Sequence, residues 1–154
     1  SLWLSIVKSS CQNKIDVVQD DEKEANLRAI LNFGHTIGHA LEAYFDYSTY
    51  KHGECVAFGM VAATHIAEQK KHLCTNDAQT IYNLIKCFDY HKIALKPVDD
   101  DQIFSLLSRD KKVKHHVLRF VLPKTIGTVF MSSDVSQSDI YSSLAFIKQF
   151  FKGS

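Results

Sequence analysis

The sequence predicts a mainly α, helical bundle-like domain with one small β-hairpin near residues 117–131. Apolar residues recur near the helical period through most of the chain. Breakers such as Lys96-Pro97 separate these runs. Only two short runs are rich in branched and aromatic residues instead. With 154 residues and 45% hydrophobic content, the chain can bury a core without disulfides, so we expect one domain over 1–154.

Five helices are expected before the hairpin, at 3–18, 22–45, 53–71, 76–88 and 99–110. Short polar side chains accept hydrogen bonds from the free amides of a helix's first turn. The candidate N-caps on this ground are Asn76 and Asp77 for the fourth helix and Asp99 and Asp100 for the fifth.

The hairpin is expected from strands at 117–122 and 128–131, joined by the Pro- and Gly-containing segment 123–127. A closing amphipathic helix follows at 137–151, with Ser136 as its N-cap. The sequence has no internal repeat, low-complexity tract or long linker.

Composition narrows the function classes. Lys plus Arg number 18 and Asp plus Glu 17, so there is no basic surface typical of nucleic-acid or membrane binding. The opening residues 1–7 are typical of a helix already under way, not of a signal peptide or membrane span. The four cysteines lack a CxxC spacing and are expected to be reduced, mostly buried small hydrophobes, which predicts a cytoplasmic setting.

The predicted helix at 22–45 carries a polar stripe of unusual composition. At about 100° per residue, one narrow face collects Glu24, Arg28, Asn32, His35, His39 and Glu42. Arg, Asn and His recognise anions or bind metals, whereas a solvated face is normally filled with Lys, Glu and Gln. Gly34 and Gly38 beside the stripe predict close approach of a ligand or a second helix.

His35, His39 and His52 are candidate metal ligands. By itself a His pair at i, i+4 is often surface decoration or a satisfied core pair. His52 opens the next apolar helical run, near a helix start that faces back toward the first helix. Two imidazoles from adjacent helices would make half of a tetrahedral zinc site, to be completed by a carboxylate and water.

These motifs carry a family resemblance. Three motifs in order are Arg28-Ala-Ile-Leu-Asn-Phe-Gly-His-Thr-Ile-Gly-His-Ala-Leu-Glu42, then His52-Gly-Glu-Cys-Val-Ala-Phe-Gly-Met60, and later Asp110-Lys-Lys112 before Leu-Pro-x-x-Ile-Gly127. Together they closely resemble the C-terminal domain of 3-dehydroquinate synthase. The match spans nearly the whole chain and keeps the order and spacing of the motifs, so we expect the dehydroquinate synthase-like fold.

The resemblance implies a role for each matching residue. It implies that His35 and His52 bind a divalent zinc or cobalt ion, and that His39 and Glu24 do acid-base work. The residues matching positions that contact the anionic sugar acid phosphate are Lys14, Arg28, Asn32, His35, His39 and Lys111. Glu42 and Glu54 are not expected to be ligands, because the family's carboxylate ligand lies elsewhere. His115 and His116 depart from the family pattern and are expected to be exposed loop residues.

The resemblance also implies a partner domain. In the family, an N-terminal domain binds NAD and supplies the carboxylate that completes the metal shell. This sequence shows no strand followed by a Gly-rich turn and helix, so it is expected to be a fragment that is inactive alone. The complete enzyme is expected to be a homodimer. It would convert 3-deoxy-arabino-heptulosonate 7-phosphate to 3-dehydroquinate and phosphate in the shikimate pathway.

Several alternatives stay open. By sequence alone, Lys14 is an ordinary solvated lysine, the cluster at 110–112 is an ordinary charged helix end, and Glu24 is part of an acidic first helical turn. Another sugar phosphate cyclase would use most of the same residues. A metal-dependent alcohol or glycerol dehydrogenase has a similar His-rich helical domain. The set Lys14, Arg28, Asn32 and Lys111, however, suits a phosphorylated acid better than a simple alcohol. The isolated chain could also serve only as a structural or binding domain.

Overall fold

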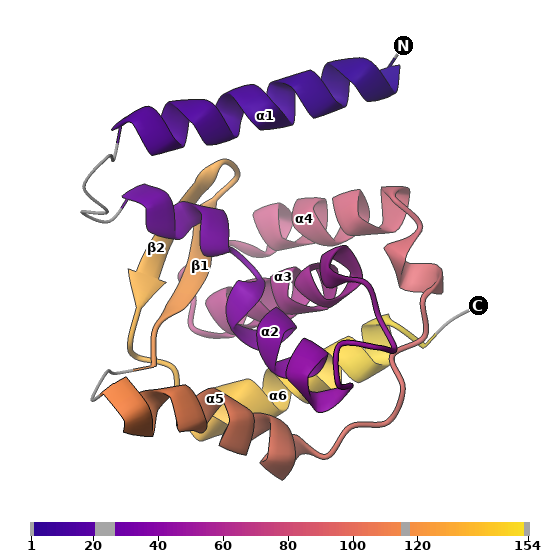
Figure 1. The fold of residues 1–154 in the computed structure, drawn as a ribbon, viewed down its shortest axis with the longest axis vertical. Helices are drawn as coiled ribbons and strands as arrows, with labels where there is room; N and C mark the ends of the chain where they lie inside the picture. The colour runs from indigo at the N-terminus through magenta and orange to yellow at the C-terminus, as the bar shows by residue number, and fades with distance from the viewer. Residues whose placement is uncertain (1, 21–26, 115–117, 153–154) are drawn as a thin grey trace. The chain divides into compact units, whose positions relative to one another are not determined.

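The computed structural model describes residues 2–20, 27–114 and 118–152 (Figure 1). It contains two compact units, Ser1–Asn32 and Phe33–Ser154, and each is described by itself. The predicted fold class is confirmed, because the described residues are mainly helical and include a two-stranded antiparallel hairpin. The expectation of a single domain over 1–154 stays a prediction.

The first unit contains the helix α1 (Leu2–Asp20) and the short 3-10 helix η1 (Leu27–Asn32). The bounds of α1 agree with the predicted helix at 3–18 within two residues. The expected continuous helix at 22–45 is wrong. After η1 the backbone turns, and α2 begins only at His35 and ends at Tyr44.

The break lies at Gly34, whose φ is +81°, a left-handed conformation that glycine adopts without a Cβ clash. A second helix, α3 (His52–Gln69), packs against this point. A Cβ on Gly34 would lie 2.7 Å from the carbonyl oxygen of Val56. Of the two expected reasons for glycine here, the structure therefore shows the approach of a second helix. His35, His39 and Glu42 share α2, whereas Arg28 and Asn32 lie in η1.

The second unit is built around α3, which contacts α2, the hairpin, α4 (Thr75–Cys87) and α6 (Gln137–Phe150). Figure 1 shows α3 in the middle of these elements. Most of α3 is buried, which explains its nearly continuous apolar sequence. Phe58 on α3 packs edge-on against Phe151 with ring centroids 4.6 Å apart. The remaining helices are η2 (Tyr90–Lys92) and α5 (Asp100–Lys114).

The helix caps follow the sequence in two of three cases. Ser136 caps α6 in a capping box with Asp139, and Asp99 Oδ1 accepts from the amides of Asp101 and Gln102 at 2.9 and 3.2 Å. The predicted caps at Asn76 and Asp77 are wrong. The amide of Ala78 already donates to the carbonyl of Cys74, so the first turn of α4 forms before Asn76.

The hairpin consists of β1 (Phe120–Thr125) and β2 (Thr128–Ser132). The expected loop at 123–127 is too long, because Pro123 pairs with Val129 and the connection is only Ile126 and Gly127. Pro123 is tolerated because a two-stranded sheet has only edge strands and because the register shifts between Pro123 and Thr125.

The cysteines are free, as predicted, but their burial is not as expected. Only Cys55 is buried, whereas Cys11, Cys74 and Cys87 are exposed. Cys11 is surrounded by exposed residues on α1, and Cys74 and Cys87 lie at the two ends of α4, away from its buried residues. Within the described ranges, no helix combines the length and the apolar character needed to cross a lipid bilayer.

His65 is a buried histidine that links α3 to α6. Its ring stacks on Phe146 with centroids 4.3 Å apart, and its Nε2 lies 3.1 Å from the Ser142 hydroxyl. Its Nδ1 is buried with no hydrogen-bond partner. Burial lowers the pKa of His65 below its ordinary 6.5, and the nearby Glu68 opposes this only in part. The ring is therefore neutral in the folded protein at neutral pH.

This burial predicts a loss of stability in acid. Because the folded-state pKa of His65 is the lower one, the unfolded chain takes up the proton first as the pH falls below about 6.5. The free energy of unfolding should fall from there until the folded pKa is passed. We expect His65→Gln to reduce this slope in thermal unfolding between pH 7.5 and 5.5, whereas His72→Gln, at an exposed histidine, should not. Equal slopes in both variants would contradict the assignment.

Candidate metal centre

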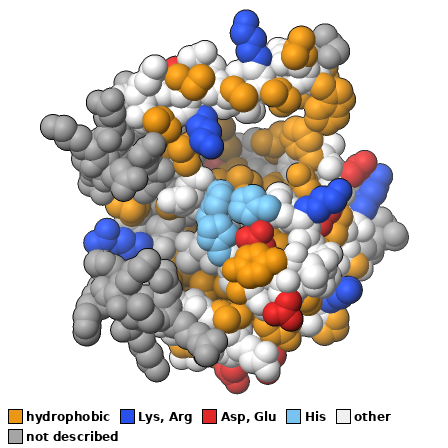
Figure 2. Space-filling view, in the orientation of Figure 1, with side chains coloured by type: hydrophobic (Ala, Val, Ile, Leu, Met, Phe, Trp, Pro, Cys, Tyr) orange, Lys and Arg blue, Asp and Glu red, His pale blue; other side chains and the backbone are white. Residues whose placement is uncertain are grey.

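Two helix beginnings form the candidate metal centre. α2 begins at His35, so the helical period places His39 one turn further on the same face. After α2, Asp46 and Tyr47 take left-handed backbone conformations, and the chain turns back into α3, whose first residue is His52. Figure 2 shows histidine side chains gathered in one group on the molecular surface.

The three imidazoles lie close together. The ring centroids are 5.2 Å apart for His35 and His39, 5.4 Å for His35 and His52, and 5.8 Å for His39 and His52. One nitrogen from each ring lies within 4.8 Å of the others. The side chains of His39 and His52 are 59% and 57% exposed, so a ligand can reach them from solvent.

Two of the rings are oriented through Nδ1. His52 Nδ1 donates to Glu42 Oε1 at 2.9 Å, and His35 Nδ1 donates to the carbonyl oxygen of Phe33 at 3.2 Å. Both arrangements leave Nε2 with a free lone pair, which is the form that binds a metal. Within the described parts of the chain, His39 makes no hydrogen bond, and its Nε2 lies 4.0 Å from Glu42 Oε2.

The electrostatics favour neutral imidazole at His35. Burial lowers the pKa of His35, and the neighbouring His39 and His52 lower it further. The hydrogen bond to Phe33 and the charge of Glu42 act in the opposite direction but do not reverse the shift. Burial also raises the pKa of the nearby Cys55 thiol to about 12, so this thiol is protonated at neutral pH.

The donor set fits a divalent transition ion. Imidazole nitrogens suit zinc and its neighbours in the first transition row, and a carboxylate behind one of them is a common supporting group. Two or three imidazoles leave at least one position open, which a catalytic metal site needs for its substrate.

Comparisons with known proteins decide the family. The family model described as 3-dehydroquinate synthase C-terminal matches residues 1–113. The chain belongs to this family. A 3-dehydroquinate synthase of Rippkaea orientalis is 46% identical over 92% of the chain, and one of Desulforamulus reducens is 38% identical over 91%. The chain spans about two fifths of the length of these relatives, 38% and 39% respectively.

Two solved structures are similar in fold. A 2-deoxy-scyllo-inosose synthase in complex with carbaglucose-6-phosphate, NAD+ and Co2+ has a TM-score of 0.67 and 31% identity, and the match covers 77% of this chain and 34% of that one. The 2-epi-5-epi-valiolone synthase of Streptomyces hygroscopicus with NAD+ and Zn2+ has a TM-score of 0.79 and 22% identity over 95% of this chain and 40% of that one.

The other residues implied by the 3-dehydroquinate synthase family are not brought into one described site. Lys14 is exposed on α1 and Asn32 is exposed at the end of η1, and both belong to the first unit. Arg28 lies in η1 and Lys111 in α5, but their side chains lie outside the description. Also outside the described residues are Glu24, His115 and His116. The roles of all these residues stay predictions.

Glu42 is the residue whose role the sequence did not reveal. It lies on the predicted polar stripe and was not expected to be a metal ligand. The structure places its carboxylate against His52 and near His39. Its position three residues after His39 was the available signal, because residues three apart share a helix face.

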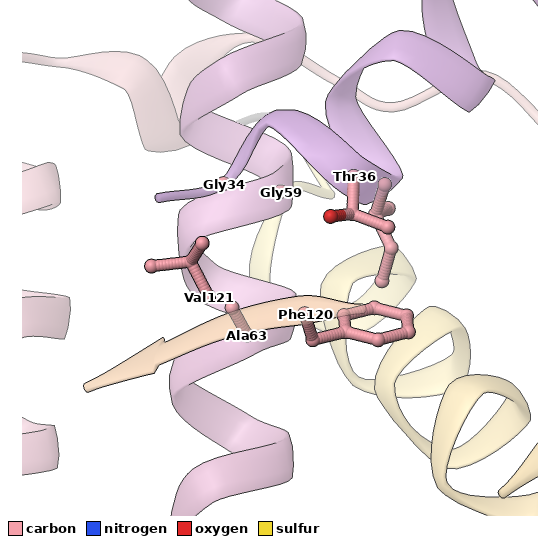
Figure 3. Close-up of a pocket in the computed structure, with 7 residues that line it drawn as sticks. Gly34, Thr36, Gly59, Ala63, Phe120 and Val121 are labelled. Carbon is pink, nitrogen blue, oxygen red and sulfur yellow. The ribbon is translucent and has the colours of Figure 1, made fainter. Parts of the chain in front are cut away.

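A small apolar depression beside this site does not offer a second binding site. It is lined by residues of α2, α3 and β1, including Gly34, Gly59 and Val121 (Figure 3). Its volume is about 160 Å³, and part of this is open solvent. The hydroxyl of Thr36 at its edge already donates to the carbonyl oxygen of Arg119 at 3.3 Å. The depression is therefore a feature of the packing between the two helices and the hairpin.

Proposed function

We propose that this chain is the C-terminal, metal- and substrate-binding part of a 3-dehydroquinate synthase. Such an enzyme is a phosphate lyase and cyclase that converts 3-deoxy-arabino-heptulosonate 7-phosphate to 3-dehydroquinate and phosphate, on the route to chorismate and the aromatic amino acids. The observation that carries the proposal is the convergence of His35, His39 and His52 within a segment that matches this family.

His35 and His52 are the proposed metal ligands, because their Nδ1 atoms are engaged and their Nε2 atoms are left free. Zinc or cobalt is the proposed ion, and the metal-containing complexes of two structurally similar synthases support this choice. When bound, such an ion acts as a Lewis acid toward the hydroxyl group that is oxidised, and NAD accepts the hydride.

The other side chains of the site bind substrate and move protons. His39 is more than half exposed and makes no described hydrogen bond of its own, which suits a group that exchanges protons with a substrate. Glu24 is the second proposed acid-base group. The phosphate, carboxylate and hydroxyls of the substrate are proposed to contact Lys14, Arg28, Asn32 and Lys111. Arginine suits a carboxylate or phosphate because it can donate two parallel hydrogen bonds.

The complete enzyme, in this proposal, is a polypeptide in which an NAD-binding domain precedes this chain. That domain also supplies the carboxylate that completes the metal shell. The enzyme is proposed to be a homodimer in the cytoplasm, and the four free cysteines agree with a reducing compartment.

The proposal predicts a sharp difference between chain and complete enzyme. With NAD and zinc, the 154-residue chain alone should release no phosphate from the heptulosonate phosphate, because it lacks a dinucleotide site and one metal ligand. The complete enzyme should release phosphate and form dehydroquinate, measured by a phosphate assay and by product absorbance. Turnover by the chain alone would contradict the proposal that a separate domain supplies the NAD site and one metal ligand. An inactive complete enzyme would contradict the proposed function.

A second candidate is another sugar phosphate cyclase. The 31% identity to 2-deoxy-scyllo-inosose synthase over 77% of the chain favours keeping this candidate. A panel of sugar phosphates, compared by kcat/KM in the complete enzyme, would separate the two. The same panel tests the dehydrogenase alternative, since a simple alcohol or glycerol dehydrogenase would not release phosphate.

A further inference from the structure

We propose that Glu42 is a positioning residue of the metal centre. Its carboxylate holds the His52 ring by Nδ1 and so directs His52 Nε2 into the site. This inference rests on the proposed function and adds one more residue to the same site.

The first argument is burial. Glu42 is only 9% exposed, and a buried carboxylate is unfavourable unless it is paired. Among the described residues, its ion-pair partners are two imidazoles, His52 at 2.9 Å and His39 at 4.0 Å, with no lysine or arginine. A metal ion bound by His52 on the side away from Glu42 would balance the buried negative charge of Glu42.

The second argument is the tautomer. An imidazole that donates from Nδ1 to a carboxylate keeps its proton there and presents the Nε2 lone pair. The carboxylate also fixes the plane of the ring. His35 receives the same support from the carbonyl of Phe33, but from a neutral group at 3.2 Å. Both proposed ligands are therefore held through Nδ1, and His39 is not.

The third argument is the rigidity of the support. Glu42 lies on α2 directly after the buried Leu41, and its own carbonyl accepts from the amide of Tyr47 at 2.8 Å. The carboxylate therefore projects from a fixed part of the helix. Its contact with His52 joins the end of α2 to the first residue of α3. Glu42 thereby sets where the second proposed ligand stands relative to the first.

Cobalt titration of the complete enzyme tests this inference. We expect Glu42→Ala to lower cobalt affinity by about 10–100-fold, the usual effect of removing a group that supports a ligating histidine. Glu42→Gln keeps a side-chain oxygen that can accept from Nδ1, so its loss should be smaller, with a shifted visible cobalt absorption. Glu54→Gln is the matched control. Glu54 lies two residues after His52 and accepts from the amide of Lys51, so the control removes one charge without touching a ring. Its affinity should stay within about twofold of the unsubstituted value.

The possible results separate this inference from the proposed function. Unchanged affinity and absorption in both Glu42 variants, while His52→Ala loses cobalt, would overturn the role of Glu42 alone. An equal loss in Glu54→Gln would overturn it as well, because the effect would then be one of overall charge. If Glu42→Ala does not fold, Glu42→Gln compared with Glu54→Gln decides the question, and identical behaviour rejects the proposal. An unsubstituted enzyme that binds no cobalt would overturn the proposed function and this inference with it.

Discussion

Replacing His35 or His52 by alanine in the complete enzyme is expected to lower zinc affinity by more than about 100-fold, since each change removes a whole ligand and not only its support. The two rings come from different helices, and each is already oriented through Nδ1. Metal content after dialysis, measured by atomic emission, checks this result.

His39→Ala should behave differently, although the His39 ring centroid lies 5.2 and 5.8 Å from those of His35 and His52, which are themselves 5.4 Å apart. Zinc should be retained, and kcat should fall by about 10²–10⁴-fold, the usual range for loss of a general acid-base group. His72→Ala, at an exposed histidine, is the control that should change neither quantity. Full zinc content in both the His35 and His52 variants would refute the ligand assignment. Loss of zinc in His39→Ala would make His39 a ligand instead.

The sequence identified these histidines as candidate site residues because their spacing predicts proximity even where the predicted helix bounds are wrong. His35 and His39 are four residues apart, so any short helix places them together, even though the long helix predicted around them is broken. His52 could be added because it begins the next apolar run. Glu42 could not be assigned, because its hydrogen bond depends on how α2 and α3 pack, and that packing is a tertiary property.

The errors in the predicted fold have the same origin. A glycine inside a helical pattern costs only about 1 kcal/mol relative to alanine, so the pattern at 22–45 gave no reason to end the helix at Gly34. The left-handed backbone at Gly34 is explained by the close packing of α3 against it, which the sequence does not show. Pro123 indicated a loop, because proline lacks the amide that a strand ladder uses. The shift in strand register that accommodates Pro123 cannot be predicted from the sequence.

The same helix contact makes Gly59→Ala the most destabilising small substitution we expect. An ideal Cβ at Gly59 would lie only 1.8 Å from the carbonyl oxygen of Gly34, and also 2.9 Å from the amide nitrogen of Gly38. Both neighbours are backbone atoms, which cannot rotate away as a side chain can. Relief therefore requires α2 and α3 to separate. Overpacking of this kind costs about 3 kcal/mol or more and should outweigh the roughly 1 kcal/mol that alanine gains over glycine inside a helix.

Urea unfolding of the 154-residue chain measures this effect, and Gly53→Ala is its control on the same helix. A Cβ at Gly53 would be 3.6 Å from the Tyr90 hydroxyl, an ordinary contact, so that variant should be as stable as the unsubstituted chain. Equal stability of the two variants would mean that the close approach of α2 and α3 is wrong. The complete enzyme with Gly59→Ala should also bind zinc more weakly, because the spacing of His35 and His52 depends on how these two helices pack. Destabilisation with unchanged zinc affinity would instead show that the metal centre does not depend on this contact.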